Sequence, residues 1–232
     1  MTFRPIYYDT ETTGIRPDKE RIVEIAAYDP VSGAQFVQLV NPGIPIPAEA
    51  TAIHGITNEM VAEAPSFADV GKAFIDFCSA PCVLIAHNND AFDKHFLDHE
   101  AKRHELTLPS WPMIDSLKWA RKYRPDLPKH SLQFLRQIYG IAENTAHRAL
   151  DDVIVLCQVF SIMIDDLPLE TVLSLLGSAS DTLPEVMPFG KHQGKPLKDI
   201  PADYLKWLKE QGAFDKPENA SLKAAIDKLK TS

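Results

Sequence analysis

The sequence predicts an α/β domain built on a mixed β-sheet, followed by a small second unit. The chain begins with three short β-branched or aromatic segments joined by turn-rich residues, and strand and helix patterns alternate after them. A small, polar, proline-ended stretch at 177–185 then interrupts these patterns. We therefore expect a domain of residues 1–176, a linker of 177–186 and a small lysine-rich module of 187–232.

The predicted strands are short apolar runs bounded by turn residues. They comprise residues 6–9, 22–28, 35–40 and 83–86. The segments GIRPDKE and DPVSG separate the first three, and their Gly, Pro and Asp residues favour turns between antiparallel strands. The fourth is continuously apolar, which is typical of a strand buried on both faces. The proline-rich segment NPGIPIPAEA is expected to be a loop, because proline cannot donate a sheet hydrogen bond.

Helical patterns dominate the chain after residue 66. Apolar residues recur at helical spacing over residues 67–77. Further helices are expected over residues 90–104, 116–123, 131–139, 149–166 and 169–177, two of them directly after proline-containing segments that would end a preceding helix. In the module, a Gly/Lys-rich turn precedes an amphipathic helix that contains Tyr204, Leu205 and Leu208, and a last helix covers 220–229.

Composition narrows the functional classes only in part. None of the 232 residues lies in an apolar run long enough to span a membrane, and Asp9 precedes any possible signal segment. From this N-terminus we expect a cytoplasmic protein. The three cysteines form no C-x-x-C pair and are expected to be reduced and packed. The net charge of −8 argues against a nucleic-acid partner, but residues 187–232 hold nine lysines against six acidic residues.

Four acidic residues and one histidine lie at the ends or edges of apolar segments. They are Asp9, Glu11, Asp93, His147 and Asp152. Carboxylates beside apolar runs are costly, and several packed together cannot all stay ionised without a cation. Oxygen ligands with one imidazole favour Mg²⁺ or Mn²⁺ over zinc. The set therefore predicts divalent-metal chemistry of the kind that cleaves phosphodiesters.

Local spacing indicates which of these side chains can converge. Asp9 and Glu11 are two apart, so on a strand they share one face and could bridge two cations about 3.5–4 Å apart. The alternative for this pair is a strand end whose charges face solvent. The following TTG provides small residues with accessible N–H groups, which would let a nucleotide approach the backbone.

Neighbouring residues leave two assignments open. Asp93 shares a helical stripe with apolar residues, whereas its rival Asp90 could be the helix N-cap. Likewise, Asp152 lies above an apolar helical stripe and Asp151 above a more mixed one, so Asp152 is the better ligand candidate. His87 and Asn88 could be hydrogen-bonding partners near a metal or ordinary turn residues.

His147 is expected on the loop before the 149–166 helix. From such a loop an imidazole could reach a metal-bound water and act as general base, because its pKa lies near neutrality. The alternative is an ordinary capping or surface histidine.

The motifs DTETTG, HN-x-x-x-FD and H-x-x-x-x-D, in this order, resemble those of the DEDDh (DnaQ-like) 3′→5′ exonucleases over about residues 5–165. The resemblance implies an RNase H-like fold, with a mixed five-stranded sheet flanked by helices. It further implies that two Mg²⁺ ions, replaceable by Mn²⁺, are bound by Asp9, Glu11, Asp93 and Asp152. His147 would deprotonate the attacking water. The tyrosine subclass of the family does not fit, because Arg148 stands four residues before Asp152.

The same resemblance extends to substrate contacts. By this analogy the terminal nucleotide would be held by Thr12, Thr13, Gly14 and Ile15, with Ile15 against the last base. His54 would lie near the terminal sugar or base, and Asn88 would support the loop of the second motif. Ile15 departs mildly from the family pattern, in which leucine is common at this position.

The activity implied is Mg²⁺-dependent removal of nucleoside 5′-monophosphates from single-stranded or frayed 3′ ends of DNA, in repair or recombination. Three alternatives stay open: a proofreading subunit like DNA polymerase III epsilon, an exoribonuclease acting on RNA, and an inactive nucleic-acid-binding module. The sequence also leaves open whether the protein forms a homodimer.

The C-terminal motifs FGK-x-x-GK and YL-x-WL resemble a small module appended to some bacterial members of that family. The lysine excess and Trp207 suggest a grip on nucleic acid, with charge contacts to the backbone and one stacking platform. In the alternative interpretation, Trp207 belongs to the core of the module and the lysines only solvate its surface.

Overall fold

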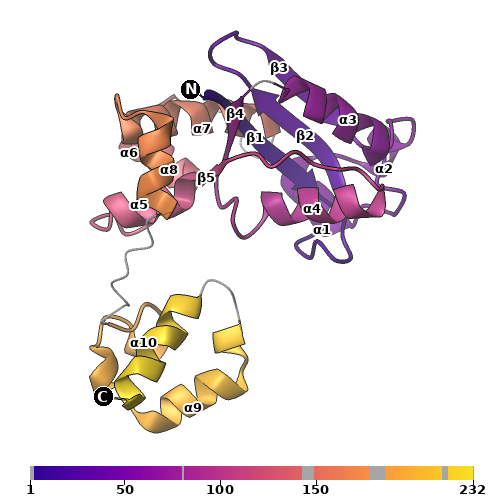
Figure 1. Ribbon diagram of the computed structural model, residues 1–232. Coiled ribbons are helices and arrows are strands. Elements are labelled where there is room, and N and C mark those ends of the chain that lie inside the picture. Colours follow the sequence, from indigo (N-terminus) through magenta and orange to yellow (C-terminus); the bar gives the residue numbers. More distant parts are fainter. Residues whose placement is uncertain (1–2, 80, 143–148, 178–185, 216–218, 232) are drawn as a thin grey trace. The chain divides into compact units, whose positions relative to one another are not determined.

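The structure is a computed structural model that describes residues 3–79, 81–142, 149–177, 186–215 and 219–231. Its contacts divide the chain into two compact units, Met1–Leu176 and Gly177–Ser232 (Figure 1). Most of the expected linker, 177–186, lies outside the described residues. We propose that residues 1–176 form a domain, that 177–186 form a linker and that 187–232 form a small module.

The first unit is built on a mixed five-stranded sheet, as predicted. Its strands are β1 (Arg4–Thr12), β2 (Ile22–Tyr28), β3 (Gln35–Leu39), β4 (Cys82–Ala86) and β5 (Met113–Asp115), in the order β3-β2-β1-β4-β5. The first three strands pair antiparallel, whereas β4 is parallel to both β1 and β5. The short strand β5 had no clear pattern in the sequence, because it offers only three residues.

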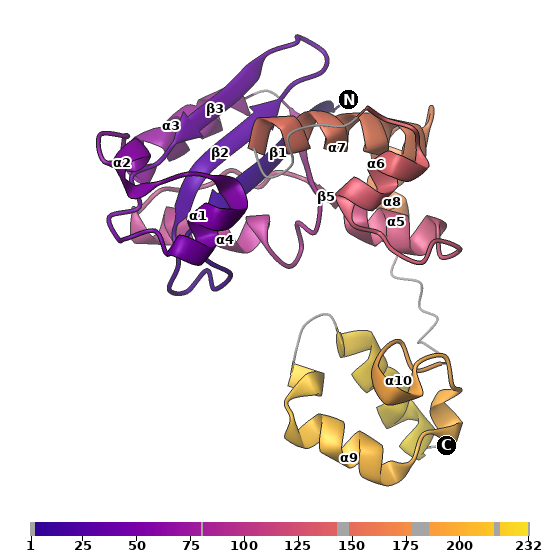
Figure 2. The same cartoon turned by 180° about the vertical axis from the view of Figure 1, so that it is seen from behind.

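Helices cover both faces of the sheet. They are α1 (Ala48–His54), α2 (Asn58–Val61), α3 (Phe67–Phe77), α4 (Asp93–Arg103), α5 (Ser116–Tyr123), α6 (Leu132–Ile138), α7 (Ala149–Ile164) and α8 (Leu169–Gly177). Alternate side chains of β1 point to opposite faces: Ile6 and Tyr8 join a core with α3 and α4, and Tyr7 joins a core with α7. Figure 1 shows α3 and α4 on one side of the sheet, and Figure 2 shows α7 on the other.

The predicted bounds of α3, α5 and α8 are confirmed to the residue, while two other predictions are wrong. Residues expected to form only a proline-rich loop contain the start of α1, whose N-cap is Pro47. Proline is compatible with a helix start, because the first N–H groups have no partner inside the helix. The helix expected from residue 90 begins at Asp93, after Phe92 with φ −134° and ψ −83°.

The second unit has a small core of its own. Its elements are the 3₁₀ turns η1 (Gly190–His192), η2 (Leu197–Asp199) and η3 (Ala213–Asp215), with helices α9 (Ala202–Glu210) and α10 (Ala220–Thr231). Its core contains Met187, Leu208 and Ile226. The amphipathic helix expected around Tyr204 is therefore confirmed as α9.

Two further findings bear on the cellular setting. All three cysteines are free thiols, with Cys78 and Cys82 buried and Cys157 half-buried. Within the described part of the chain, no helix combines the length and apolar character needed to cross a membrane.

His87, at the end of β4, ties three segments of the first unit together. Its Nδ1 lies 2.8 Å from Ser116 Oγ, and its Nε2 lies 2.9 Å from the carbonyl oxygen of His130. The carbonyl can only accept, so Nε2 carries the proton and Nδ1 accepts from the serine. Burial lowers the pKa of His87 to about 4, which keeps the ring neutral.

His87 should therefore make stability depend on pH below neutrality. Its folded pKa lies below the ordinary value of 6.5, so the unfolded chain binds a proton that the folded chain does not. We expect this group to lower the free energy of unfolding by about 3 kcal/mol as pH falls from 6.5 to 4. Urea unfolding of the unchanged protein and of His87→Gln across this range measures it. Equal slopes in both proteins would contradict the assignment.

Candidate active site

The site lies at the edge of the sheet where β1, β4 and β5 end. Because these strands are parallel, their carboxyl ends meet at one edge. The pairing of β1 with β4 extends from Arg4↔Cys82 only to Tyr7↔Ile85. Beyond Tyr7 the two strands part, and the last residues of β1 are open to side chains from other elements.

Asp9 and Glu11 share one face of β1, as their spacing predicts. Both are half-buried, whereas Thr10 between them is buried. Tyr7 precedes them on the same face and packs in the α7 cluster, so the two carboxylates lie on the side of the sheet that α7 covers. On the neighbouring strand Glu24 is paired with Glu11 and is only 2% exposed.

Asp93 reaches the same point of β1 from α4. It is the first residue of that helix and is 1% exposed. Its Oδ1 accepts hydrogen bonds from the backbone N of Thr10 at 3.1 Å and from Thr10 Oγ1 at 2.7 Å. Burial nevertheless raises the pKa of Asp93 to about 7, because two donors do not replace the lost hydration.

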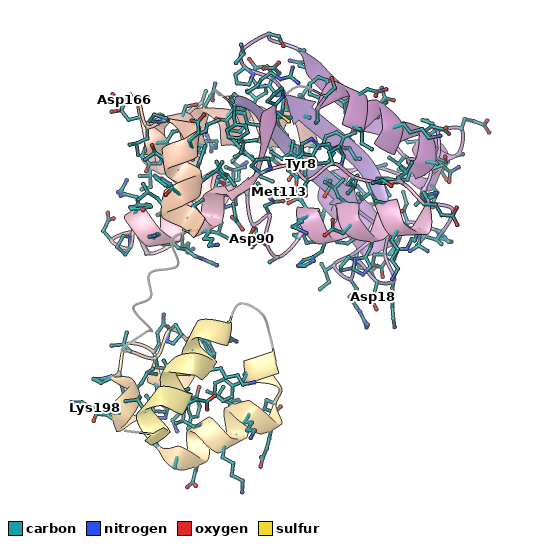
Figure 3. All side chains as sticks on the ribbon, viewed as in Figure 1. Tyr8, Asp18, Asp90, Met113, Asp166 and Lys198 are labelled. Carbon is teal, nitrogen blue, oxygen red and sulfur yellow. The ribbon has the colours of Figure 1, made fainter. Side chains whose placement is uncertain are left out.

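Asp90 does not have the N-cap role left open for it. Helix α4 begins three residues later, and the exposed Asp90 carboxylate lies 3.3 Å from Lys118 Nζ. Asp90 and Met113, both labelled in Figure 3, line a shallow pocket on the surface. Of the two candidates, only Asp93 is buried against β1.

Asp152 approaches from the opposite side of the sheet. It lies half-buried in the first turn of α7, and its Oδ1 accepts a hydrogen bond from Gln133 Nε2 at 2.9 Å. His147, the expected general base, falls outside the described residues. Its role stays a prediction from the motif.

The negative charges of the neighbouring carboxylates all act on Asp9. Burial raises the pKa of Asp9 well above its ordinary value, and the carboxylates of Asp93, Glu11, Asp152 and Glu24 raise it further. Like charges disfavour one another's ionisation, so these side chains lie near enough to interact. Among the described residues, however, no three acidic, histidine or cysteine side chains are arranged to hold a metal ion. In this arrangement Asp93 is turned to Thr10 and Asp152 to Gln133.

The donor set fits a divalent cation in its chemistry. It consists of carboxylate oxygens, which Mg²⁺ and Mn²⁺ prefer, and it carries a repulsion at Asp9 that a cation would relieve. A cation site is therefore indicated by the repulsion between carboxylates at Asp9 and by the oxygen atoms that would bind the ion.

Two acidic residues near this edge were missed by the sequence analysis. Glu24 is the lone charge in the apolar strand IVEIAAY, a signal that could have found it. Asp115 ends β5, and its carboxylate accepts hydrogen bonds from the backbone N–H groups of Asn88 (3.1 Å), Asp90 (3.0 Å), Leu117 (2.9 Å) and Lys118 (3.1 Å). Asp115 therefore fixes the loop that leads to Asp93. No local sequence pattern predicts these contacts.

The expected substrate residues at the end of β1 differ in how their side chains are used. Thr12 Oγ1 donates to the Gly14 carbonyl at 2.6 Å, and Thr13 Oγ1 donates to Glu20 Oε2 at 2.6 Å. Both hydroxyls thus shape the loop. A Cβ on Gly14 would lie only 3.0 Å from the Glu20 side chain, so a larger residue here would require Glu20 to shift. Ile15 is 83% exposed, which is unusual for so apolar a side chain.

His54 and Asn88 take up special positions. His54 is the last residue of α1 and is 3% exposed; its Nδ1 accepts from the N of Ile56 at 3.0 Å. Its Nε2 has no hydrogen-bond partner among the described residues, although the Thr12 carbonyl acts on the ring. Burial lowers the pKa of His54. Asn88 has φ 72°, a left-handed conformation that asparagine tolerates.

Beside Asn88, a buried hydrogen bond from the Tyr8 hydroxyl to Asn89 Oδ1 anchors the loop to β1. Tyr8 is labelled in Figure 3.

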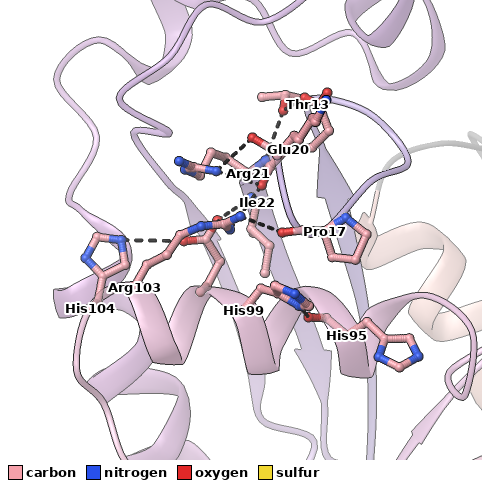
Figure 4. A network of polar contacts seen from close by, with 11 residues as sticks. Thr13, Pro17, Glu20, Arg21, Ile22, His95, His99, Arg103 and His104 are labelled. Carbon is pink, nitrogen blue, oxygen red and sulfur yellow. Dashed lines mark hydrogen bonds and ion pairs between the residues drawn. The ribbon is translucent and has the colours of Figure 1, made fainter.

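Helix α4 also clamps the β1–β2 loop that carries Thr12 to Ile15 (Figure 4). Near its C-terminal end, Arg103 donates through Nη2 to the Pro17 carbonyl at 2.5 Å and through Nη1 to the Glu20 carbonyl at 3.1 Å. Glu100 Oε1 lies 3.2 Å from Arg103 Nη1 and accepts from the N of Ile22 at 3.3 Å. One rigid helix thus positions both Asp93 and the loop.

A family model described as "Exonuclease" matches residues 6–160 of this chain. The chain belongs to the exonuclease family. Its DnaQ-like character and RNase H-like fold, expected from the three motifs, are confirmed for this exonuclease-family protein. A second model, described as "Putative quorum-sensing-regulated virulence factor", matches residues 180–231, so the smaller unit is similar to a separate family.

Named relatives match the larger unit. Exonuclease DPD1, chloroplastic/mitochondrial, of Arabidopsis thaliana is 37% identical in an alignment 181 positions long that covers 71% of this chain and 57% of that protein. The DNA polymerase III subunit epsilon-like protein of Rhodobacter capsulatus is 40% identical in an alignment 171 positions long that covers 69% of this chain and 23% of that protein. This chain therefore spans less than two thirds of the length of each of these two relatives.

Solved structures agree. Exonuclease X in complex with 5′ overhanging duplex DNA is similar with a TM-score of 0.59 and 27% identity, over 75% of this chain and 99% of that one. Relatedness to bacterial exodeoxyribonuclease X was expected from the C-terminal motifs, but the matched chain covers only three quarters of this one. An Escherichia coli ExoI–ssDNA complex has a TM-score of 0.64 at 20% identity, over 75% of this chain and 43% of that one, and shows the fold alone.

Arg103→Ala should loosen the β1–β2 loop, because two carbonyls lose their charged donor and Glu100 loses its cation. We expect a loss of about 1–3 kcal/mol in the free energy of unfolding and faster amide hydrogen exchange over residues 13–22. Denaturant titration and exchange mass spectrometry measure these effects. Lys102→Ala, an exposed neighbour on the same helix, is the matched control. Identical exchange in the two variants would refute the clamp.

Proposed function

We propose that this protein is a Mg²⁺-dependent 3′→5′ exonuclease that removes nucleoside 5′-monophosphates from single-stranded or frayed 3′ ends of DNA, in repair or recombination. Mn²⁺ is expected to substitute for Mg²⁺. We place the activity in the cytoplasm, because the three cysteines are free thiols, as expected in a reducing compartment.

The convergence of acidic side chains on Asp9 is the observation that carries this proposal. Buried like charges destabilise a fold, so a sequence that assembles them at one sheet edge needs a compensating cation. Membership of the exonuclease family and the similarity to Exonuclease X, solved with DNA, support phosphodiester hydrolysis on DNA.

Asp9, Glu11, Asp93 and Asp152 are the proposed metal ligands. Divalent cations bound there would polarise the phosphate, lower the pKa of a bound water and neutralise charge on the leaving oxygen. Asp93 accepts hydrogen bonds from Thr10, and Asp152 accepts one from Gln133, so an ion would have to draw both carboxylates from these partners toward Asp9 and Glu11.

His147 is proposed as the general base that takes the proton of the attacking water, on the strength of its place in the third motif. Thr12, Thr13, Gly14 and Ile15 are proposed to hold the terminal nucleotide. The hydroxyls of the two threonines shape this loop, so its contacts to the nucleotide would come from backbone N–H groups and from the exposed Ile15 side chain. An apolar side chain at this position suits contact with a base face.

His54 and Asn88 complete the proposed substrate site. The Nδ1 of His54 accepts from Ile56 N, so Nε2 carries the proton, and it has no hydrogen-bond partner among the described residues. A sugar or base oxygen would compete with the Thr12 carbonyl, which acts on the ring, for this donor. Asn88 supports the second-motif loop through its backbone N–H, which donates to Asp115.

A proofreading subunit is the second candidate. It is favoured by the similarity to a DNA polymerase III subunit epsilon-like protein and to a PolC-type DNA polymerase III of Streptococcus pneumoniae, which is 35% identical over 62% of this chain and 10% of that protein. Both candidates share the chemistry. Stable co-purification with a replicative polymerase would favour proofreading.

Digestion of a 5′-labelled single-stranded DNA tests the activity. With Mg²⁺ we expect a ladder that shortens from the 3′ end, no cleavage in EDTA, and slower cleavage of the matched RNA. Asp9→Ala and His147→Ala should each lower the rate by roughly 10²–10⁴-fold. Asp90→Asn, which removes an exposed carboxylate near Asp93, should keep the rate. Release of mononucleotide from the 5′ end, or cleavage that resists EDTA, would overturn the mechanism.

Metal binding should also be visible in thermal stability. In EDTA at pH 8 the cluster destabilises the fold, because burial and the neighbouring carboxylates oppose ionisation of Asp9. Asp9→Asn removes one of these charges, so we expect its Tm to be higher by about 2–4 °C for each kcal/mol relieved. Mg²⁺ or Mn²⁺ should raise the Tm of the unchanged protein but not that of the variant. An equal rise in both would place the ion elsewhere.

A further inference from the structure

The smaller unit presents a fixed turn that the nuclease chemistry does not use. The FGK-x-x-GK motif forms this turn around η1, where Gly190 and Gly194 have φ 75° and 80°. A Cβ on Gly190 would collide with the Tyr204 hydroxyl, so glycine allows η1 to lie directly against α9. Backbone hydrogen bonds of 2.8 Å from Met187 N to the Lys195 carbonyl and from Gly194 N to the Met187 carbonyl close the turn.

This close approach aligns three aromatic rings. The His192 ring meets Tyr204 edge-on, with centroids 4.6 Å apart and an interplanar angle of 69°. Tyr204 stacks on Trp207, with centroids 5.6 Å apart and an angle of 26°. Trp207 is 50% exposed, so it is not a core residue of the unit. Helix α9 instead buries Leu208, leaving the indole on its flank.

Two lysines of the turn stand next to these rings. Lys191 and Lys195 are exposed, and their charges add to desolvation in lowering the pKa of His192. Both ammonium groups therefore act on the ring that ends the aromatic row. Lys198 of η2, labelled in Figure 3, is exposed on the same unit.

Two other lysines lie elsewhere on the unit. Lys206 and Lys209 line a groove of about 520 Å³ together with Lys223 and Ile226 of α10. On a helix of 3.6 residues per turn, Lys206 and Lys209 lie about 100° and 160° around α9 from Trp207, on the flank away from Tyr204. The unit therefore offers one lysine pair beside aromatic rings and another pair away from them.

We propose that His192, Tyr204 and Trp207 form a stacking platform for single-stranded DNA, with Lys191 and Lys195 contacting the adjacent phosphates. This assignment rests on the proposed function for its choice of DNA. Exposed aromatic faces beside cations match the alternating bases and phosphates of an unpaired strand, because every base can stack. The two motifs of the unit are thereby explained together: the glycines set the turn, and the turn sets the rings and charges.

Binding of a fluorescein-labelled oligo(dT) to the full-length protein in EDTA tests the platform without cleavage. Trp207→Ala should weaken binding by roughly 5–150-fold, since one stacked base contributes about 1–3 kcal/mol. Trp207→Phe should restore much of the loss. Lys191→Ala/Lys195→Ala should make the slope of log K against log salt shallower by about 1.4, the value for two phosphate contacts on a single strand.

Lys206→Ala/Lys209→Ala is the matched control, because it removes the same charge from the flank of α9 away from Tyr204. It should change the salt slope less than the Lys191/Lys195 pair does. Unchanged affinity in Trp207→Ala, or equal slopes for the two lysine pairs, would overturn the platform. Because half of Trp207 is buried on Tyr204, its loss will also lower the stability of the unit, and Trp207→Phe, which keeps a ring on Tyr204, controls for this effect.

Hydrolysis of a dinucleotide separates this proposal from the proposed function. A dinucleotide occupies the candidate active site without needing the platform, so the unchanged protein and Trp207→Ala should cleave it equally in Mg²⁺. Failure of both to cleave would reject the nuclease assignment, while the binding comparison in EDTA still decides the platform. Slower dinucleotide cleavage by Trp207→Ala alone would contradict a role confined to binding longer strands.

Discussion

Repulsion between buried carboxylates is the constraint on which the candidate site depends. Asp9 lies among carboxylates from its own strand, from β2, from α4 and from α7, and each raises its pKa. Repulsion between these carboxylates cannot itself hold them together. Other residues hold them in place: Thr10 donates to Asp93, and Gln133 donates to Asp152. The conflict is useful only if a cation resolves it, which links the electrostatics of the fold to the proposed chemistry.

Helix α4 transmits the geometry of the sheet to the rest of the site. Its first residue, Asp93, binds the end of β1, and its last turn binds the β1–β2 loop through Glu100 and Arg103. The loop before it is held by Asp115 at the end of β5. Direct hydrogen bonds therefore connect Asp93, the β1–β2 loop and the sheet edge through this one helix. The smaller unit follows a similar principle, since a glycine turn brings the His192 ring of η1 against the stacked Tyr204 and Trp207 of α9.

Local periodicity was sufficient to bound several helices that have one apolar face. Helices α3, α5 and α8 could be bounded from the sequence, because burial of one stripe repeats every three or four residues. Short elements were not predicted from the sequence. Strand β5 has only three residues, and α1 follows prolines that exclude a strand but allow a helix. The start of α4 was misplaced because the Asn88 turn, with φ 72°, depends on Asp115 from a distant strand.

The sequence by itself determined the chemical types at the site, because the order and spacing of Asp9, Glu11, Asp93 and Asp152 are properties of the chain. Only the tertiary structure decided that Asp93 is buried at the site and Asp90 is exposed. It placed Glu24, which no sequence motif indicated, near Asp9. It also decided that Trp207 lies on the surface and not in a core. The physical reason is that spacing fixes a side chain's direction along one element, whereas its neighbours depend on strand register and on the packing of distant segments.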